Sequence, residues 1–224
     1  MYTATGRFAN EENAPSFIIT MNVTNTKKMR IGLYGGGFDP IHFGHLILMQ
    51  TAIETLDLEK VIVMPSGGVA HYKVDPTFTP GSARYDMACL ATESNPRLEV
   101  DSFEVDQGRF VYTINTLRHL QGKYSGIAEI ILLVGGDWKD KIPTWKNGEQ
   151  LIKEFPIAVF SRPGFEHTTD LTLPSSGEQI VYVNMPLIDI SSSMIRERVR
   201  ASLSIEYYAP EPVRRYIEGK HLYR

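Results

Sequence analysis

The chain has 224 residues, of which 42% are hydrophobic, 10% aromatic and 22% charged, and its formal net charge is −3. This length allows one large domain, and the small net charge provides no field that would attract nucleic acid or an anionic membrane. The single cysteine, Cys89, excludes a disulfide framework and a cysteine-based zinc site. No apolar run reaches the roughly 18 residues that a membrane span needs, so we expect a cytoplasmic protein.

Residues 1–29 differ in composition from the rest, because they are rich in Asn and Thr and hold only one short apolar stretch, Phe17–Ile19. Two lysines follow this stretch, whereas a secretory signal carries its positive charge before the apolar run. We therefore expect a leader of unknown role over 1–29, followed by a single domain over 30–224. Translation that begins at Met21 or Met29 is the alternative.

Along 30–224, short apolar runs alternate with segments of helical periodicity. The runs that predict strands are Arg30–Gly35, Lys60–Pro65, Arg97–Asp101, Glu129–Val134, Ile157–Ser161 and Val181–Asn184. Apolar residues at helical spacing predict helices over 43–56, 84–93, 112–121, 192–200 and 210–218. A loop rich in glycine and proline over 66–80 is long enough to suggest a role. This alternation predicts a doubly wound α/β fold: a mostly parallel, Rossmann-like sheet with helices on both faces and a helical C-terminus.

The most informative segment is GGGFDPIHFGH, from Gly35 to His45, where the first predicted strand passes into the first helix. Its glycines let the backbone turn tightly and approach a ligand. The free N–H groups and the positive dipole end of the following helix form a site for anions. Each histidine alone is typical of packing or capping. His42 and His45 together, three residues apart on one face of the helix start, predict a cradle for phosphate oxygens.

A second segment, ISSSMIR over Ile190–Arg196, lies where a C-terminal helix is expected to begin. Serines are good N-caps, but Arg196 then falls in the first helical turn, where a cation opposes the helix dipole. A bound anion would reverse that penalty. The alternative is a plain serine cap with an arginine that faces solvent.

These two segments resemble the GxFDPxHxGH and ISSxxIR signatures of the nucleotidyltransferases. Within that superfamily the chain is similar, over roughly 30–224, to the bacterial nicotinate mononucleotide adenylyltransferases. The further segments that match family motifs are Val111–Leu117 (VYTINTL), Val134–Asp137 (VGGD), Pro143–Trp145 (PTW), Ser161–Gly164 (SRPG) and Pro210–Tyr223.

Two single positions and one loop segment depart from the family pattern. Gly37 stands where the family usually has Thr, Val111 stands where it has Ser, and VAHYK over 69–73 replaces a P-P-H-K loop. The third change lies in the loop expected to cover the mononucleotide. The preference between nicotinate and nicotinamide forms of the acceptor therefore stays open.

The resemblance implies an enzyme of NAD biosynthesis that transfers the adenylyl group of ATP to nicotinate mononucleotide, giving deamido-NAD and pyrophosphate. It implies that His45, His42 and Arg196 are catalytic, with His45 stabilising the transition state and Arg196 holding the β- and γ-phosphates. The metal would be Mg²⁺, held through the phosphates and by no side chain. The residues implied to bind ATP are Gly35, Gly36, Gly37, Phe38, His42, His45, Asp137, Ser192, Ser193 and Arg196.

For the mononucleotide, the resemblance implies amides that receive the carboxylate, a ring that stacks on the pyridine and cations that hold the phosphate. The implied residues are Tyr112, Thr113, Trp145, Arg162 and Lys73. Simple packing is the alternative for Trp145, a turn aspartate is the alternative for Asp137, and a solvated loop residue is the alternative for Lys73.

The expected partners are these two small-molecule substrates, with no nucleic acid and no membrane, while a homo-oligomer stays open. One alternative function is transfer to another acceptor, such as nicotinamide mononucleotide, pantetheine phosphate or a cytidylyl acceptor with CTP. Val111–Leu117 and Trp145 favour a pyridine nucleotide. Another alternative, from a different class, is a nucleotide-binding regulatory module without catalysis.

Overall fold

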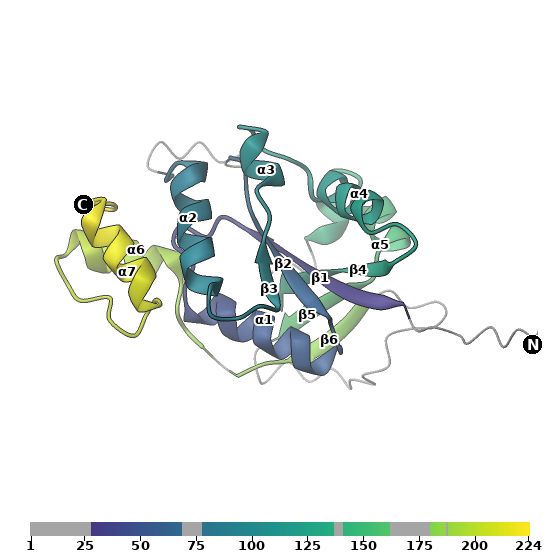
Figure 1. Cartoon of the computed structure of the whole chain (residues 1–224), viewed down its shortest axis with the longest axis horizontal. Helices are drawn as coiled ribbons and strands as arrows, with labels where there is room; N and C mark the ends of the chain where they lie inside the picture. The colour runs from purple at the N-terminus through teal and green to yellow at the C-terminus, as the bar shows by residue number, and fades with distance from the viewer. Residues whose placement is uncertain (1–27, 69–77, 137–140, 162–179, 187) are drawn as a thin grey trace, which may run out of the picture.

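A computed structural model of the chain describes residues 28–68, 78–136, 141–161, 180–186 and 188–224 (Figure 1). In this part of the chain, six strands form one sheet in the order β3-β2-β1-β4-β5-β6, and all neighbouring strands run parallel. The strands are β1 (Met29–Gly36), β2 (Lys60–Pro65), β3 (Leu98–Val100), β4 (Ala128–Gly135), β5 (Ile157–Ser161) and β6 (Ile180–Asn184). The expected strands are confirmed to within two residues at their ends.

The order of the strands reverses between β1 and β4, which pair at the centre of the sheet. This is the strand order of the doubly wound Rossmann fold, so the predicted fold class is confirmed. In such sheets, ligands bind outside the carboxyl ends of the strands, next to the reversal. The glycine-rich segment follows the carboxyl end of β1 and so lies at this point.

Helices connect the strands and cover both faces of the sheet (Figure 1). The helices are α1 (Phe43–Thr55), α2 (Gly81–Thr92), α3 (Phe103–Asp106), α4 (Thr113–Lys123), α5 (Gly148–Glu154), α6 (Ser192–Arg200) and α7 (Glu211–Gly219), with a 3₁₀ turn at Ile142–Thr144. The five expected helices are confirmed to within three residues at their ends. The sequence did not predict α3, a single turn without a periodic signal, or α5, a helix of seven residues.

Alternate residues of each central strand point into two separate cores. Val61 and Ile131 pack in the core that also holds apolar residues of α1, α2, α6 and α7. Their neighbours Ile62 and Leu132 pack in the second core, with residues of α4 and α5. Burial on both faces explains why these strands read as continuous apolar runs.

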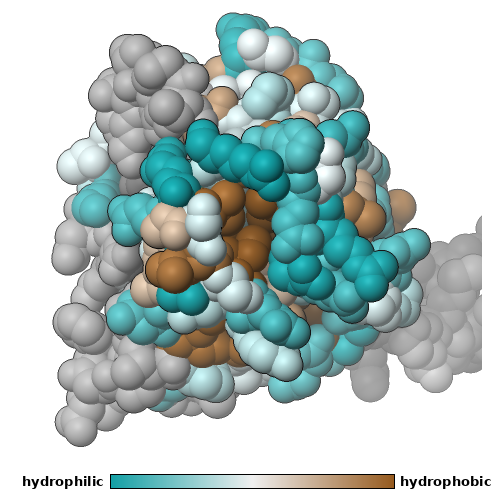
Figure 2. Space-filling view, turned by 90° about the vertical axis from the view of Figure 1, so that its left-hand side faces the viewer, coloured by the Kyte–Doolittle hydropathy of each residue, from teal (hydrophilic) through white to brown (hydrophobic). Residues whose placement is uncertain are grey.

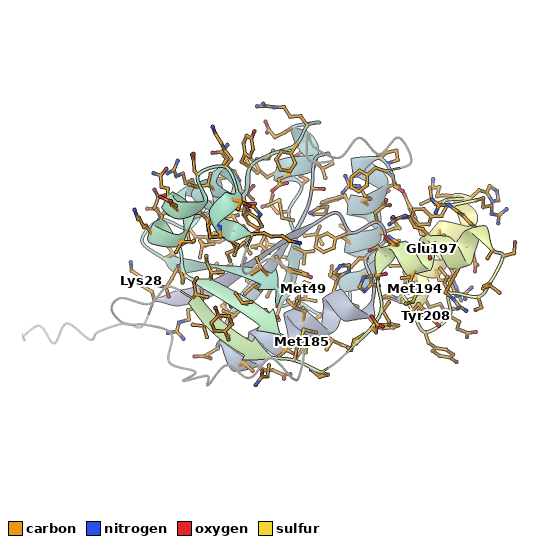
Figure 3. All side chains as sticks on the ribbon, turned by 180° about the vertical axis from the view of Figure 1, so that it is seen from behind. Lys28, Met49, Met185, Met194, Glu197 and Tyr208 are labelled. Carbon is orange, nitrogen blue, oxygen red and sulfur yellow. The ribbon has the colours of Figure 1, made fainter. Side chains whose placement is uncertain are left out.

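The C-terminal unit, α6 and α7 with the segment between them, lies at one end of the molecule (Figure 1). Seen from behind, Met194, Glu197 and Tyr208 mark this unit, and Lys28 lies at the opposite end (Figure 3). The side of the molecule where this unit lies carries an apolar area framed by hydrophilic residues (Figure 2). Of the helices that the structure describes, none is both long and apolar enough to cross a membrane.

Two expected segments lie largely or partly outside the described residues. The leader expected over 1–29 is described only at Lys28 and at Met29, where β1 begins. Of the loop expected over 66–80, residues 66–68 and 78–80 are described and form no helix or strand.

Candidate active site

The glycine-rich turn joins β1 to α1 in a tightly constrained conformation. Phe38 is buried and has a positive φ of 47°, and the Asp39–Pro40 peptide is cis. A Cβ on Gly36 would lie 3.1 Å from the Phe38 ring, so glycine lets the ring pack beneath the turn. His42 ends the turn as the N-cap of α1, as the sequence predicts for a helix that begins there.

The two histidines form one unit at the start of α1. Their rings stack with centroids 3.7 Å apart and an interplanar angle of 25°. The backbone N–H of His42 donates to Nδ1 of His45 at 3.2 Å. Because Nδ1 of His45 accepts this bond, neutral His45 carries its proton on Nε2, where it can be donated to a ligand oxygen. The predicted pairing of the two imidazoles is confirmed.

Burial shapes the protonation of this pair. His42 is 5% exposed, and burial lowers its pKa to about 4. Burial also lowers the pKa of His45 well below its usual value, and the charge that His42 would carry adds to that effect. Both rings are therefore neutral near pH 7 in the free protein. A bound polyanion would favour their protonated forms and raise both pKa values.

The second signature meets this turn directly. Arg196 Nη1 donates to the Asp39 carbonyl at 2.8 Å, and the Ser192 hydroxyl donates to the Pro40 carbonyl at 2.9 Å. Ser191 caps α6 by accepting from the Met194 N–H at 3.2 Å. The serine cap of the alternative is therefore present. Arg196, however, is half-buried against the glycine-rich turn and does not simply face solvent.

Ser193 completes the contacts at the start of α6. Its hydroxyl accepts from Nη2 of Arg196 at 3.3 Å, so both arms of the guanidinium are oriented by the protein. The starts of α1 and α6 are therefore joined in one hydrogen-bonded unit. Two helix N-termini, each with a positive dipole end, lie at this junction.

A buried carboxylate supports the turn from behind. Asp39 is 4% exposed, and its Oδ1 accepts from the Tyr223 hydroxyl at 2.7 Å while its Oδ2 accepts from the Thr79 N–H at 3.4 Å. Burial and the nearby charge of Asp39 raise the pKa of Tyr223, which keeps the hydroxyl protonated as a donor. The Phe43 N–H at the start of α1 donates to the Tyr208 carbonyl at 3.3 Å. The C-terminal tail therefore holds the turn in place.

From the sequence, Asp39 had no predicted role, and Tyr223 belonged only to a tail motif. Arg84 was predicted as an ordinary helix residue, although its side chain is fully buried behind the turn. The pattern of apolar residues along the chain does not reveal the bond from Tyr223 to Asp39 or the bond from Arg84 to Gly37, because the partners lie far apart in the sequence.

Of the residues expected to bind the mononucleotide, the three that the structure describes lie on the α4 side of the sheet. Tyr112 is the N-cap of α4 and Thr113 is its first residue, so the positive end of the α4 dipole lies there. Trp145 follows the 3₁₀ turn, is half-buried, and packs with Tyr112 against the second core. This placement is compatible with both stacking and packing. Lys73, Asp137 and Arg162 lie outside the described residues.

A buried glutamate connects this side to the loop after β2. Glu104 is 7% exposed, and its Oε1 accepts from the Thr116 hydroxyl of α4 at 2.6 Å. Burial raises its pKa to about 7, although the Thr116 hydroxyl and the Gly67 N–H, both donors to it, oppose the shift. A Cβ on Gly67 would lie 2.0 Å from the Glu104 carbonyl oxygen, so only glycine allows this approach.

Comparison with known proteins gives a consistent result. The cytidylyltransferase-like family matches residues 33–198. A relative from Moorella thermoacetica, named "probable nicotinate-nucleotide adenylyltransferase", is 37% identical over 204 residues, which cover 89% of this chain and 94% of the relative. A relative of the same name from Thermoanaerobacter sp. is 37% identical over 203 residues, which cover 88% of this chain and 96% of the relative.

Solved structures agree on the fold. Plasmodium falciparum nicotinic acid mononucleotide adenylyltransferase, solved in complex with NaAD, superposes with a TM-score of 0.69 at 20% identity. The superposition covers 87% of this chain and 97% of that one. A structure of the same protein in complex with APC gives the same TM-score. At this identity the likeness concerns the fold alone.

Proposed function

This chain belongs to the nicotinate-nucleotide adenylyltransferases of the cytidylyltransferase-like family, and we propose that it transfers the adenylyl group of ATP to nicotinate mononucleotide in NAD biosynthesis. The products are deamido-NAD and pyrophosphate. The observation that carries this proposal is the bond from Arg196 to the Asp39 carbonyl, which joins the two signature segments into one site with the His42–His45 pair.

The reaction needs placement and positive charge more than it needs a base. A phosphate oxygen of the mononucleotide attacks the α-phosphorus of ATP, a new P–O bond forms, and the bond to the bridging oxygen of the β-phosphate breaks. The attacking oxygen is already anionic, so no proton has to be removed. What opposes the reaction is repulsion between two polyanions and the charge that develops on pyrophosphate. Fixed donors and cations at the right places reduce both.

The part of the site assigned to ATP, which donates the adenylyl group, supplies these donors and cations; we call it the donor side. In our proposal, His45 donates from Nε2 to the reacting phosphate and His42 binds a neighbouring phosphate oxygen. Arg196 holds the β- and γ-phosphates, since a guanidinium offers a planar fork of N–H donors that matches phosphate oxygens. The remaining residues proposed to contact ATP are Gly35, Gly36, Gly37, Phe38, Asp137, Ser192 and Ser193.

The part of the site assigned to the mononucleotide, which accepts the adenylyl group, recognises that substrate; we call it the acceptor side. We assign the nicotinate carboxylate to backbone N–H groups at Tyr112 and Thr113, where the dipole of α4 favours an anion. Trp145 is assigned to the pyridine ring, and Lys73 and Arg162 are assigned to the mononucleotide phosphate. All of these roles are proposals that follow from the family resemblance.

The proposed metal is Mg²⁺, which enters with ATP. Within the described residues, no group of three or more His, Cys, Asp and Glu side chains could hold a metal ion. We propose that phosphate oxygens and water coordinate the ion, an arrangement that Mg²⁺ commonly adopts with nucleotides. When bound, Mg²⁺ would neutralise phosphate charge next to the groups named above.

A matrix of donors and acceptors tests this proposal. Purified protein is incubated with ATP or CTP, each paired with nicotinate mononucleotide, nicotinamide mononucleotide or pantetheine phosphate, and pyrophosphate release is measured. We expect the highest kcat/KM with ATP and nicotinate mononucleotide. A higher value with another pair would reassign the substrate, and nucleotide binding without any pyrophosphate would indicate a regulatory module. We also propose a cytoplasmic location, because charged nucleotides do not cross a bilayer unaided.

A further inference from the structure

Arg84, in the first turn of α2, is the most completely buried charged residue of the described chain, with 0% of its surface exposed. Its guanidinium donates to three backbone carbonyls: from Nε to Thr79 at 2.8 Å, from Nη1 to Gly37 at 2.7 Å and from Nη2 to Ser66 at 2.5 Å. The guanidinium carbon lies 4.2 Å from the centroid of the Phe78 ring. Every nitrogen of this side chain is thus bonded to the backbone of a loop.

A guanidinium is a costly group to bury for packing alone. Burial lowers the pKa of Arg84, while the charges of Asp39 and Glu104 oppose that shift. The side chain stays protonated near neutral pH. An apolar side chain of similar volume would fill the same space without desolvating a charge. What Arg84 adds is therefore a set of directed bonds that tie three loop positions together.

The bonded loops belong to both halves of the site. Gly37 lies in the turn that we assign to ATP. Ser66 follows β2, and its neighbour Gly67 packs so closely that a Cβ would lie 2.0 Å and 2.4 Å from the carbonyl oxygens of Glu104 and Arg109. That packed segment leads directly into α4, whose N-terminus we assign to the mononucleotide. Arg84 thus connects the donor side to the acceptor side through the backbone.

We propose that Arg84 is a positioning residue that fixes the glycine-rich turn against the loop after β2 and so sets the distance between the two bound substrates. The inference rests on the proposed function, because it requires two substrates on these two segments. The reacting atoms must approach to about 3–3.5 Å, and a displacement of about 1 Å costs about 100-fold in rate. Loss of Arg84 should leave each half-site able to bind while it separates the reacting atoms.

The test compares three variants of the full chain. Arg84→Met removes all the directed bonds, and Arg84→Lys keeps the charge and can satisfy fewer of the carbonyls. Thr92→Val is the matched control, because Thr92 is also buried on α2 but donates within that helix, to the Ala88 carbonyl at 3.0 Å. Melting temperature, kcat and the KM for each substrate are measured for all three.

We expect Arg84→Met to lower kcat by about 30-fold or more, with each KM changed by less than about threefold. Arg84→Lys should fall between Arg84→Met and the wild type, and Thr92→Val should keep kcat within about twofold of the wild type. In a fourth variant, Arg84→Ala, added methylguanidine should partly restore kcat, and it should not change kcat of Thr92→Val.

An Arg84→Met enzyme with wild-type kcat would overturn the inference. A loss of kcat no larger than that of Thr92→Val, with the two variants melting at the same temperature, would also overturn it. So would a higher KM with an unchanged kcat. If Arg84→Met does not fold, Arg84→Lys decides by the same readouts, and a wild-type kcat in that variant counts against positioning. If the wild type itself releases no pyrophosphate, the proposed function fails, which is a separate outcome.

Discussion

The two sides of the site are built differently. On the donor side, side chains of α6 and of the C-terminal tail bond the turn between β1 and α1, from positions more than 150 residues further along the chain. On the acceptor side, Tyr112 and Trp145 pack against the second core, and Glu104 braces the start of α4 by accepting from the Thr116 hydroxyl.

This difference suggests a division of labour. The donor side is fixed by directed hydrogen bonds, as a site that must stabilise a developing charge requires. The acceptor side presents one helix N-terminus and one aromatic ring, which suit recognition of a planar, negatively charged ligand. Substitutions on the donor side should therefore act mainly on kcat, and those on the acceptor side mainly on KM.

The largest effect is expected for His45→Ala. Loss of one preorganised donor to the reacting phosphate should lower kcat by 100- to 1,000-fold, about 3–4 kcal/mol of transition-state stabilisation. Steady-state kinetics with ATP and nicotinate mononucleotide measures it. His119→Ala, at an exposed histidine on α4, is the control and should keep wild-type kcat. A His45→Ala enzyme with more than a tenth of the wild-type kcat would remove His45 from the mechanism.

The next effect concerns Glu104, whose pKa rises from 4.5 to about 7 on folding. Below pH 4.5 the carboxyl is protonated in both the folded and the unfolded chain. Between pH 4.5 and 7 the unfolded chain releases this proton and the folded chain retains it, so the free energy of unfolding falls as pH rises. The fall should amount to about 3 kcal/mol and should level off above pH 7.

Glu104→Gln should remove this contribution, because the amide does not titrate. Urea unfolding at pH 5, 6, 7 and 8 measures the difference in unfolding free energy between the variant and the wild type. That difference should shift in favour of Gln between pH 5 and 7 and stay constant from pH 7 to 8. Glu59→Gln, at an exposed site, should differ from the wild type by less than about 0.5 kcal/mol at every pH. A constant difference for Glu104→Gln would contradict a neutral buried carboxyl.

Much of this architecture was predictable from the sequence, because it depends on periodicity and on local motifs. Continuous apolar runs located the strands, and the alternation of strands and helices gave the parallel topology that brings the carboxyl ends of β1, β2 and β4 to one edge. The spacing of His42 and His45 predicted that they share one face, whereas their stacking depends on the extended backbone of His42 at the N-cap of α1.

The supporting contacts were not predictable in the same way. Arg84 lies in the first turn of α2, and no local sequence pattern distinguishes a buried guanidinium from an exposed one. Its acceptor Gly37 lies 47 residues away, and the Tyr223–Asp39 bond spans 184 residues. Such pairings are set by tertiary packing, so the signatures revealed which residues carry the chemistry but not which residues hold them in place.

A smaller effect is expected for Tyr223→Phe, which removes the hydroxyl that donates to Asp39. Because the carboxylate is buried, loss of a donor should cost about 2 kcal/mol and lower the melting temperature by about 4–8 °C. Tyr207→Phe, at a tyrosine that is 82% exposed, should leave the melting temperature unchanged. If Tyr223→Phe melts with the wild type, the tail does not support the turn through this bond.

The smallest effect should be the most selective one. Trp145→Ala should raise KM for nicotinate mononucleotide about fivefold, a loss near 1 kcal/mol of ring stacking, and should leave KM for ATP within twofold of the wild type. Trp145→Phe, which keeps an aromatic face, should recover most of the lost affinity. Because Trp145 also packs against the second core, a packing role predicts a lower melting temperature with equal changes in both KM values. The ratio of the two KM values therefore separates recognition from packing, whatever the variant does to stability.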